Sequence, residues 1–306
     1  MCAVHSQSEA GQPDDDWPRV PSKHGARKHL ARSTKPPLEV FTTTLWEYPS
    51  QHYVSSRGIP EQGDRDYVGA TPSWVIWQCL QRYTKEGDLV VDPMCGSGTT
   101  IDVALDLKRR VKGFDLSPPP PDRSEFDRRD IIQADARTLP LKDAEADFVF
   151  IDPPYSTHVE YSDDPRDIGK LDAAPDSPDQ GRKYYKAMGE VIAEIDRILK
   201  PGKHMALYVS DSWKQKGTRH EARGTSERLP KRDNPPSAQC LVPSTSFSPI
   251  GFELFSILRR HFTSVDIIAV VRHNAKLQKP DWHTAAREGN YFLRGFNYLF
   301  IMNKTK

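Results

Sequence analysis

The chain has 306 residues, and its 43 lysines and arginines almost balance its 42 aspartates and glutamates, so the formal net charge is +1. This balance excludes the uniformly basic composition of a protein that binds polyanions over its whole surface. Hydrophobic residues make up 37% of the chain, which is enough for a substantial core and excludes wholesale disorder.

The cysteines and the apolar runs indicate a soluble protein of a reducing compartment. The four cysteines are widely spaced and form no Cys-x-x-Cys pair, so we expect no bound metal. The first twenty residues are polar and include Asp14–Asp16, which is unlike a signal peptide. No apolar run approaches the length of about 18 residues that a membrane-spanning helix needs. We therefore expect a cytoplasmic protein with no membrane partner.

Residues 1–38 are polar and rich in proline. Between Trp17 and Leu38 there is no acidic residue, and the basic residues are Arg19, Lys23, Arg27, Lys28, Arg32 and Lys35. This composition predicts a flexible basic N-terminal arm over 1–38, followed by one domain over 39–306.

From residue 72 onward, helical and strand patterns alternate. The expected helices are 72–84, 99–109, 184–199 and 252–262, and the expected strands are 89–91, 111–114, 131–132, 147–151, 204–209, 265–271 and 296–302. No long helix is evident between the last two strands, so we expect them to form an antiparallel hairpin at the sheet edge. The alternation predicts an α/β fold: a three-layer, doubly wound, mostly parallel Rossmann-like sheet.

Two stretches interrupt this alternation, at about 157–180 and 211–248. Both are too long for tight turns, so each is a candidate substrate-binding insertion. The second carries seven basic and three acidic residues between 212 and 236. These basic residues either contact phosphate or belong to a solvated loop.

The turn after the first strand has the composition of a nucleotide-binding turn. It reads Asp92-Pro93-Met94-Cys95-Gly96-Ser97-Gly98-Thr99-Thr100. Ligands of doubly wound sheets bind at the C-terminal ends of the strands, where Gly96 and Gly98 let the backbone approach a ligand and Asp92 adds a carboxylate. Asp115, after the next strand, can accept both hydroxyl protons of a ribose, and Asp135 can accept from an adenine amine. Together these residues outline a nucleoside site.

A dinucleotide-dependent dehydrogenase is the rival interpretation of this turn. Its G-x-G-x-x-G fingerprint has a third glycine where this chain has Ile101. The carboxylate of Asp92 also suits an ammonium group better than a pyrophosphate. In the purely structural alternative, the glycines only shape a turn and the acids cap helices.

The second motif is Asp152-Pro153-Pro154-Tyr155, at the end of the strand expected beside the first one. Proline fixes φ and has no N–H, so the free polar groups of this loop are acceptors: the Asp152 carboxylate and the Pro153 carbonyl. Two acceptors suit an NH2 group, and Tyr155 offers a face on which a planar base can stack.

With these two motifs, the region 72–306 resembles the S-adenosylmethionine-dependent DNA amino-methyltransferases, which methylate N6 of adenine or N4 of cytosine. Residues 92–100 resemble the family's D-P-F-x-G-S-G-T-T cofactor motif, with Met94 in place of the usual Phe, and residues 152–155 resemble its D/N/S-P-P-Y/F/W motif. The segment 292–300 resembles the closing strand more loosely. The resemblance implies a Rossmann-like methyltransferase sheet that binds S-adenosylmethionine, with catalysis by Asp152, Pro153, Pro154 and Tyr155. It assigns cofactor binding to Asp92, Pro93, Met94, Cys95, Gly96, Ser97, Gly98, Thr99, Asp115 and Asp135.

The resemblance also implies the substrate and the partners. The substrate would be double-stranded DNA with the target base flipped out of the helix. N6 of adenine is favoured over N4 of cytosine because Asp, rather than Ser, opens the tetrapeptide. A restriction or defence protein is a candidate partner, and an enzyme that acts without one is the alternative.

Two other functions compete with this hypothesis. RNA methyltransferases, such as guanine-N2 enzymes of tRNA or rRNA, also use D-P-P-Y loops, although residues 1–70 show no clear RNA-binding domain. A non-enzymatic nucleic-acid binder would not need both intact motifs. Among weaker features, we expect His158 and Glu160 to be solvated loop residues rather than catalysts. The aromatic residues Trp213, Trp282 and Tyr291 are expected to pack in the core rather than contact DNA.

Overall fold

A computed structural model of the chain describes residues 38–48, 62–64, 67–118, 130–215, 245–272, 277, 279–288 and 291–305, with only the backbone for 213–215 and 245–246. The chain divides into two units, Met1–Pro36 and Pro37–Lys306, and every described residue belongs to the second. The predicted basic arm and the basic residues 216–232 therefore lie outside the described residues.

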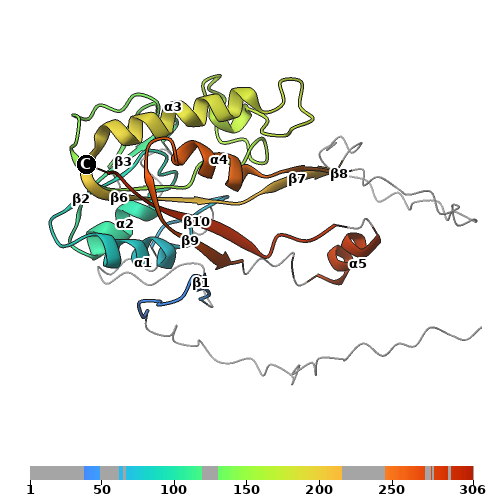
Figure 1. Cartoon of the computed structure of the whole chain (residues 1–306), viewed down its shortest axis with the longest axis horizontal. Coiled ribbons are helices and arrows are strands. Elements are labelled where there is room, and N and C mark those ends of the chain that lie inside the picture. Colours follow the sequence, from blue (N-terminus) through green and yellow to red (C-terminus); the bar gives the residue numbers. More distant parts are fainter. Residues whose placement is uncertain are drawn as a thin grey trace, which may run out of the picture. The chain divides into compact units, whose positions relative to one another are not determined.

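Eight strands of the described chain form one sheet in the order β1-β9-β10-β6-β5-β2-β3-β4 (Figure 1). Their bounds are β1 Leu45–Trp46, β2 Leu89–Asp92, β3 Arg110–Asp115, β4 Ile131–Gln133, β5 Ala146–Ile151, β6 Leu199–Val209, β9 Thr263–Val271 and β10 Phe296–Asn303. The run from β4 to β6 is parallel, and β10 is antiparallel to both of its neighbours. This is the predicted doubly wound, mostly parallel sheet with an antiparallel terminal hairpin.

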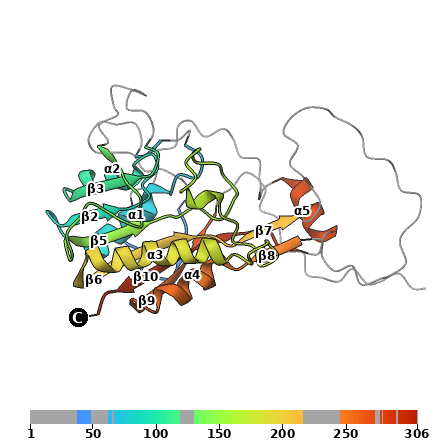
Figure 2. The same cartoon turned by 90° about the horizontal axis from the view of Figure 1, so that it is seen from above.

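Helices cover both faces of the sheet (Figure 2). Helices α1 (Ser73–Tyr83) and α2 (Thr99–Asp106) pack on one face, and α3 (Arg182–Ile198) and α4 (Ile250–Leu258) pack on the other. Successive residues of the central strands alternate between the two cores: Val90 lies with α1 and α2, and Val91 lies with α3. The central strands are therefore continuously apolar, because both of their faces are buried.

The final hairpin differs from its predicted position. Strand β10 lies between β9 and β6 rather than at the sheet edge, and β1 pairs with the outer side of β9. The consecutive β10 residues Leu299 and Phe300 pack into the two cores on opposite faces of the sheet, so β10 needs helices over both of its faces. A nine-residue helix, α5 (Pro280–Glu288), lies in the connection between β9 and β10.

The two predicted insertions differ in their regular structure. The first contains a short 3-10 helix, η1 (Ile168–Lys170). In the second, β7 (Ser212–Gln215) and β8 (Thr245–Ser248) form an antiparallel pair, so the two ends of this insertion lie side by side. Within the described part of the chain, no helix combines the length and the apolar character needed to cross a membrane.

Candidate active site

A large cavity opens at the C-terminal edge of the parallel strands. Its volume is about 1780 Å³, and its walls include Asp92, Asp115 and Asp152. Asp92 and Asp115 are the last residues of β2 and β3, and Asp152 directly follows β5. Pockets for single small ligands usually measure about 300–1,000 Å³, so this cavity has room for two ligands side by side.

The turn after β2 is held by its own aspartate. Asp92 is buried, and its carboxylate accepts hydrogen bonds from the Met94 backbone N–H (3.0 Å) and the Thr100 hydroxyl (2.5 Å). Burial raises the pKa of Asp92 to about 7. Asp92 lies on the cavity wall as expected, but it also braces the turn.

Glycine is required at two positions of this turn. Gly96 has a φ of +51° and Gly98 a φ of +86°, a left-handed conformation that other residues rarely adopt. Gly98 is the N-cap of α2 and does not line the cavity, whereas Pro93, Met94, Cys95, Gly96, Ser97 and Thr99 do. The predicted cofactor turn therefore reaches the cavity at every position except Gly98.

Asp115 connects this turn to the end of β3. Its carboxylate accepts from the Gly96 N–H (3.0 Å) and the Ser117 N–H (2.9 Å), and the Cys95 N–H donates to the Phe114 carbonyl (2.9 Å). Burial raises the pKa of Asp115. Each carboxylate oxygen keeps a lone pair for a further donor such as a ribose hydroxyl.

Asp135 reaches the same cavity but is already paired. Its carboxylate accepts two hydrogen bonds from the Arg137 guanidinium, at 2.9 and 2.6 Å, and one from the Arg137 backbone N–H. These contacts with Arg137 lower the pKa of Asp135. An adenine amine at this position would share the carboxylate with the guanidinium.

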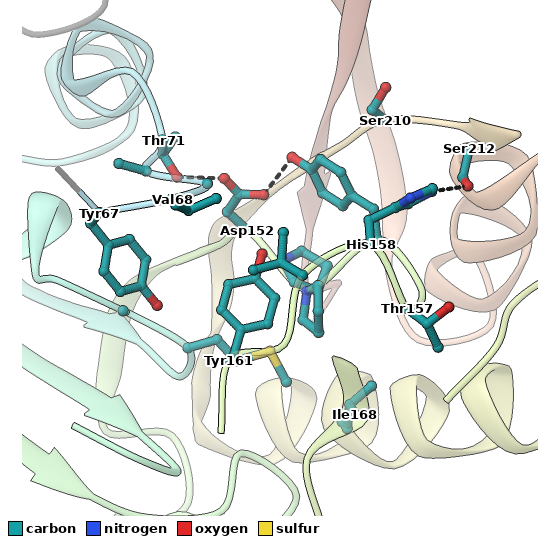
Figure 3. Close-up of a pocket in the computed structure, with 18 of the residues that line it drawn as sticks. Tyr67, Val68, Thr71, Asp152, Thr157, His158, Tyr161, Ile168, Ser210 and Ser212 are labelled. Atoms are coloured by element: carbon teal, nitrogen blue, oxygen red, sulfur yellow. Dashed lines mark hydrogen bonds between the residues drawn. The ribbon is translucent and has the colours of Figure 1, made fainter. Parts of the chain in front are cut away.

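The predicted catalytic tetrapeptide follows β5, the strand next to β2, so it lies at the same edge of the sheet as the cofactor turn. Both oxygens of Asp152 are held by hydroxyl groups: Thr71 donates to one and Tyr155 to the other, each at 2.6 Å (Figure 3). The Tyr184 hydroxyl, from α3, donates to the Pro154 carbonyl at 2.8 Å and holds the loop against that helix. Desolvation raises the pKa of Asp152 to about 7, although the bonds from Thr71 and Tyr155 act in the opposite direction. All four residues of the tetrapeptide line the cavity.

Several residues of the cavity wall were not predicted. Tyr67 packs so closely on the cofactor turn that a Cβ on Gly96 would lie 2.9 Å from its ring, and Tyr161 packs against Gly69 and Gly169. Burial raises the pKa of Tyr161 to about 12, so its hydroxyl stays protonated at neutral pH. The hydrogen bond from Thr71 to Asp152 joins residues 81 positions apart in the sequence, so no local sequence pattern predicts it.

Two expectations about weaker features are corrected by the structure. His158 is exposed, as expected of a loop residue, and it also lines the cavity and is hydrogen-bonded to Ser212 (Figure 3). Trp282 and Tyr291 line the cavity instead of packing in the core, because the β9–β10 connection that carries them extends beyond the sheet. The Trp213 side chain lies outside the described part of the structure. Glu160 is exposed and away from the cavity wall.

The cavity residues fit S-adenosylmethionine. The hydroxyl oxygen of Ser97 is buried in the wall and has no hydrogen-bond partner among the described residues. It lies just before the N-terminus of α2, where backbone N–H groups favour an anion such as the carboxylate of the methionine moiety. Asp115 can hold the ribose as described above. The described residues contain no group of three or more His, Cys, Asp or Glu side chains arranged for a metal ion.

Two family models match the sequence. A family described as DNA methylase matches residues 4–119, and a family described as methyltransferase domain matches residues 91–167. The second match contains both the cofactor turn and the tetrapeptide. No curated protein matches the sequence of the chain at a significant level.

Three solved structures illustrate the structural matches. TrmN from Thermus thermophilus has 15% identity over 78% of this chain and 50% of its own, with a TM-score of 0.44, so the match spans half the length of TrmN. A SAM-dependent methyltransferase from Methanosarcina mazei has 14% identity over 74% of this chain and 98% of its own (TM-score 0.42). The 1,6-didemethyltoxoflavin-N1-methyltransferase of Burkholderia thailandensis has 18% identity over 79% of this chain and 80% of its own (TM-score 0.42).

At these TM-scores the family assignment depends on the sequence models and on the site itself. The glycine turn after β2, the acid at the end of β3 and the unpartnered Ser97 hydroxyl all lie within the residues that both models match. The chain is an S-adenosylmethionine-dependent methyltransferase.

Proposed function

We propose that this methyltransferase acts on the exocyclic amine of a base flipped out of double-stranded DNA, with N6 of adenine favoured over N4 of cytosine. The main support is the position of Asp152, a carboxylate on the wall of a cavity that has room for a base beside the cofactor. The match of residues 4–119 to a DNA methylase family supports the choice of DNA.

The cavity walls suit a planar base bearing an amine. An exocyclic amine is a poor nucleophile while its lone pair is delocalised into the ring. The Asp152 carboxylate can accept a proton of the amine in a hydrogen bond, which favours the pyramidal nitrogen whose lone pair is free to attack. Thr71 and Tyr155 hold the two carboxylate oxygens, so this acceptor is oriented before the base arrives.

The reaction balances with the groups present. S-adenosylmethionine supplies an electrophilic methyl group on a sulfonium. As the N–C bond forms, the C–S bond breaks and its electron pair neutralises the sulfur. The amine then carries one proton too many, and Asp152, with a pKa of about 7, can take it and pass it to water.

The raised pKa of Asp152 predicts the pH dependence. The ionised carboxylate is the stronger acceptor and the form that can take the amine proton, so kcat/KM for the nucleic-acid substrate should rise with pH through about 7. Replacing Thr71 with valine removes a hydrogen bond that lowers this pKa, and should move the rising limb to higher pH. Replacing the exposed Thr138 with valine is the matched control. If kcat/KM rises at the same pH in wild type, Thr71→Val and Thr138→Val, the assignment of this pH dependence to Asp152 is wrong.

The same shift affects stability in a defined direction. Between the usual aspartate pKa of about 4 and the folded value of about 7, the folded protein binds more protons than the unfolded chain. The contribution of Asp152 to the free energy of unfolding therefore falls as pH rises across this window.

The proposal is tested by offering both classes of nucleic acid. The protein is incubated with S-adenosylmethionine carrying a tritiated methyl group and with either unmethylated genomic DNA or total RNA, and the labelled nucleosides are then separated. We expect label in DNA as N6-methyladenine. Label in N4-methylcytosine would correct the base, and label in RNA alone would overturn the DNA assignment in favour of an RNA methyltransferase.

A further inference from the structure

One part of the cavity wall is built by the connection between β9 and β10. The wall residues from this connection are Arg272, Leu277, Asp281, Trp282, Ala285, Tyr291, Leu293 and Arg294. Most of these side chains are apolar or aromatic, and two of them are arginines. The cofactor contacts described above come from other residues, so this part of the wall is available to a different ligand.

The two arginines are brought together by strand pairing. Val271 pairs with Phe296 in the hairpin, and the Arg272 N–H donates to the Gly295 carbonyl at 2.9 Å. Arg294 precedes Gly295, so the two guanidinium groups start from neighbouring places in the fold although they are far apart in sequence. Within the described structure, neither guanidinium forms an ion pair with a carboxylate.

Arg294 is held in place while part of its donor capacity is unused. Its guanidinium carbon lies 4.6 Å from the centroid of the Phe247 ring in β8, a cation–π contact that fixes the plane of the group. Its Nε atom is buried and has no hydrogen-bond partner in the part of the chain that the structure describes. A buried donor without an acceptor is costly, so this site favours a ligand that supplies one.

Arg272 directs a second charge toward the same space. One of its terminal nitrogens donates to the Ser210 hydroxyl at 3.3 Å, a long bond that leaves most of its donors available. Its charge lowers the pKa of Asp152 and Tyr155, so it lies within electrostatic range of the catalytic loop. Among the acids of the cavity wall, Asp211 already accepts from the Gly251 N–H and the Tyr298 hydroxyl, and Asp281 lies in the first turn of α5.

We propose that Arg272 and Arg294 form a phosphate clamp that binds the sugar-phosphate backbone next to the extruded base. This inference rests on the proposed function. Two guanidinium forks that line the same cavity can each bind an oxygen of a phosphodiester, and a nucleotide whose base reaches Asp152 carries its phosphate on the outer side of that base. The clamp binds backbone rather than base edges, so it adds affinity and register without sequence preference.

The clamp also connects the active site to the second insertion. Phe247 belongs to β8, which pairs with β7. The first residue of β7, Ser212, is hydrogen-bonded to His158 on the cavity wall.

The test measures binding to a short mixed-sequence duplex over a series of salt concentrations, with S-adenosylhomocysteine present to prevent turnover. Wild type is compared with the double variant Arg272→Ala/Arg294→Ala. The matched control is Arg259→Ala/Arg260→Ala, which removes two exposed arginines at the end of α4, away from the cavity. We expect the slope of log K against log salt to become shallower by about 0.9 for each phosphate that the clamp variant no longer neutralises, and to stay unchanged in the control.

Further measurements separate a binding role from a structural one. S-adenosylhomocysteine affinity and thermal stability should be the same in all three proteins. Arg272→Lys/Arg294→Lys should keep the salt slope but bind the duplex more weakly, since lysine keeps the charge and loses the fork. Equal slopes in the clamp and control variants would overturn the clamp. A wild-type protein that does not bind duplex DNA at all would instead overturn the proposed function.

Discussion

Replacement of Asp152 with alanine is expected to lower kcat roughly 100- to 1000-fold, the range that follows the removal of one preorganised polar group. The alanine variant has no acceptor for the amine protons, and the Thr71 and Tyr155 hydroxyls lose their common partner. The cofactor contacts are assigned to other residues, in the turn after β2 and at the end of β3, so the Kd for S-adenosylmethionine should stay close to that of wild type. Single-turnover methylation and calorimetric titration measure the two quantities separately.

Two further variants sharpen this test. Asp152→Asn keeps one carbonyl acceptor, and the family that the tetrapeptide resembles also uses Asn here, so its kcat should fall between those of alanine and wild type. Asp163→Ala removes an exposed acid from the loop near the cavity and is the control for charge alone. If Asp152→Ala keeps the wild-type kcat, the mechanism is wrong, whatever the nucleic acid proves to be.

The sequence predicts one wall of the cavity well. The acids Asp92, Asp115 and Asp152 each stand at or just after the end of a short apolar run, and parallel strands bring their ends to a common edge. The position of each acid at the end of its own strand is enough to predict that they lie close together, because adjacent parallel strands end at the same edge of the sheet. The pairing of Asp135 with Arg137 was also available locally, since the two residues are only two positions apart.

The opposite wall depends on contacts between distant segments. Thr71 reaches Asp152 across 81 positions, and Arg272 and Arg294 come to neighbouring backbone positions through the pairing of β9 with β10. The same topology explains why Trp282 and Tyr291 line a cavity. Their aromatic character suggested a core, but the connection that carries them extends beyond the two helix layers. Periodicity identifies elements; it does not show which connection closes over a ligand.

Replacement of Gly96 with alanine is expected to weaken cofactor binding roughly tenfold or more. Gly96 has a φ of +51°, which costs an L-residue about 1–2 kcal/mol, and the new Cβ would lie 2.9 Å from the ring of Tyr67. Either the turn or Tyr67 must move, and the Gly96 N–H that donates to Asp115 would move with the turn. A decrease of about 1.4 kcal/mol in binding free energy corresponds to a tenfold rise in Kd. Calorimetric titration with S-adenosylhomocysteine measures it without turnover.

The chain contains a control that separates backbone strain from the contact with Tyr67. Gly87 also has a left-handed φ, +82°, but a Cβ there would meet nothing within 4 Å, and it lies away from the cavity. Gly87→Ala should therefore lower the free energy of unfolding by about 1–2 kcal/mol and leave the Kd unchanged. A double-mutant cycle with Tyr67→Ala then isolates the contact, because alanine at position 67 removes the ring that the new Cβ would meet. If Gly96→Ala weakens binding equally in the presence and absence of the Tyr67 ring, strain in the turn accounts for the weaker binding; if the ring's removal restores affinity, Tyr67 is the residue that requires glycine at position 96.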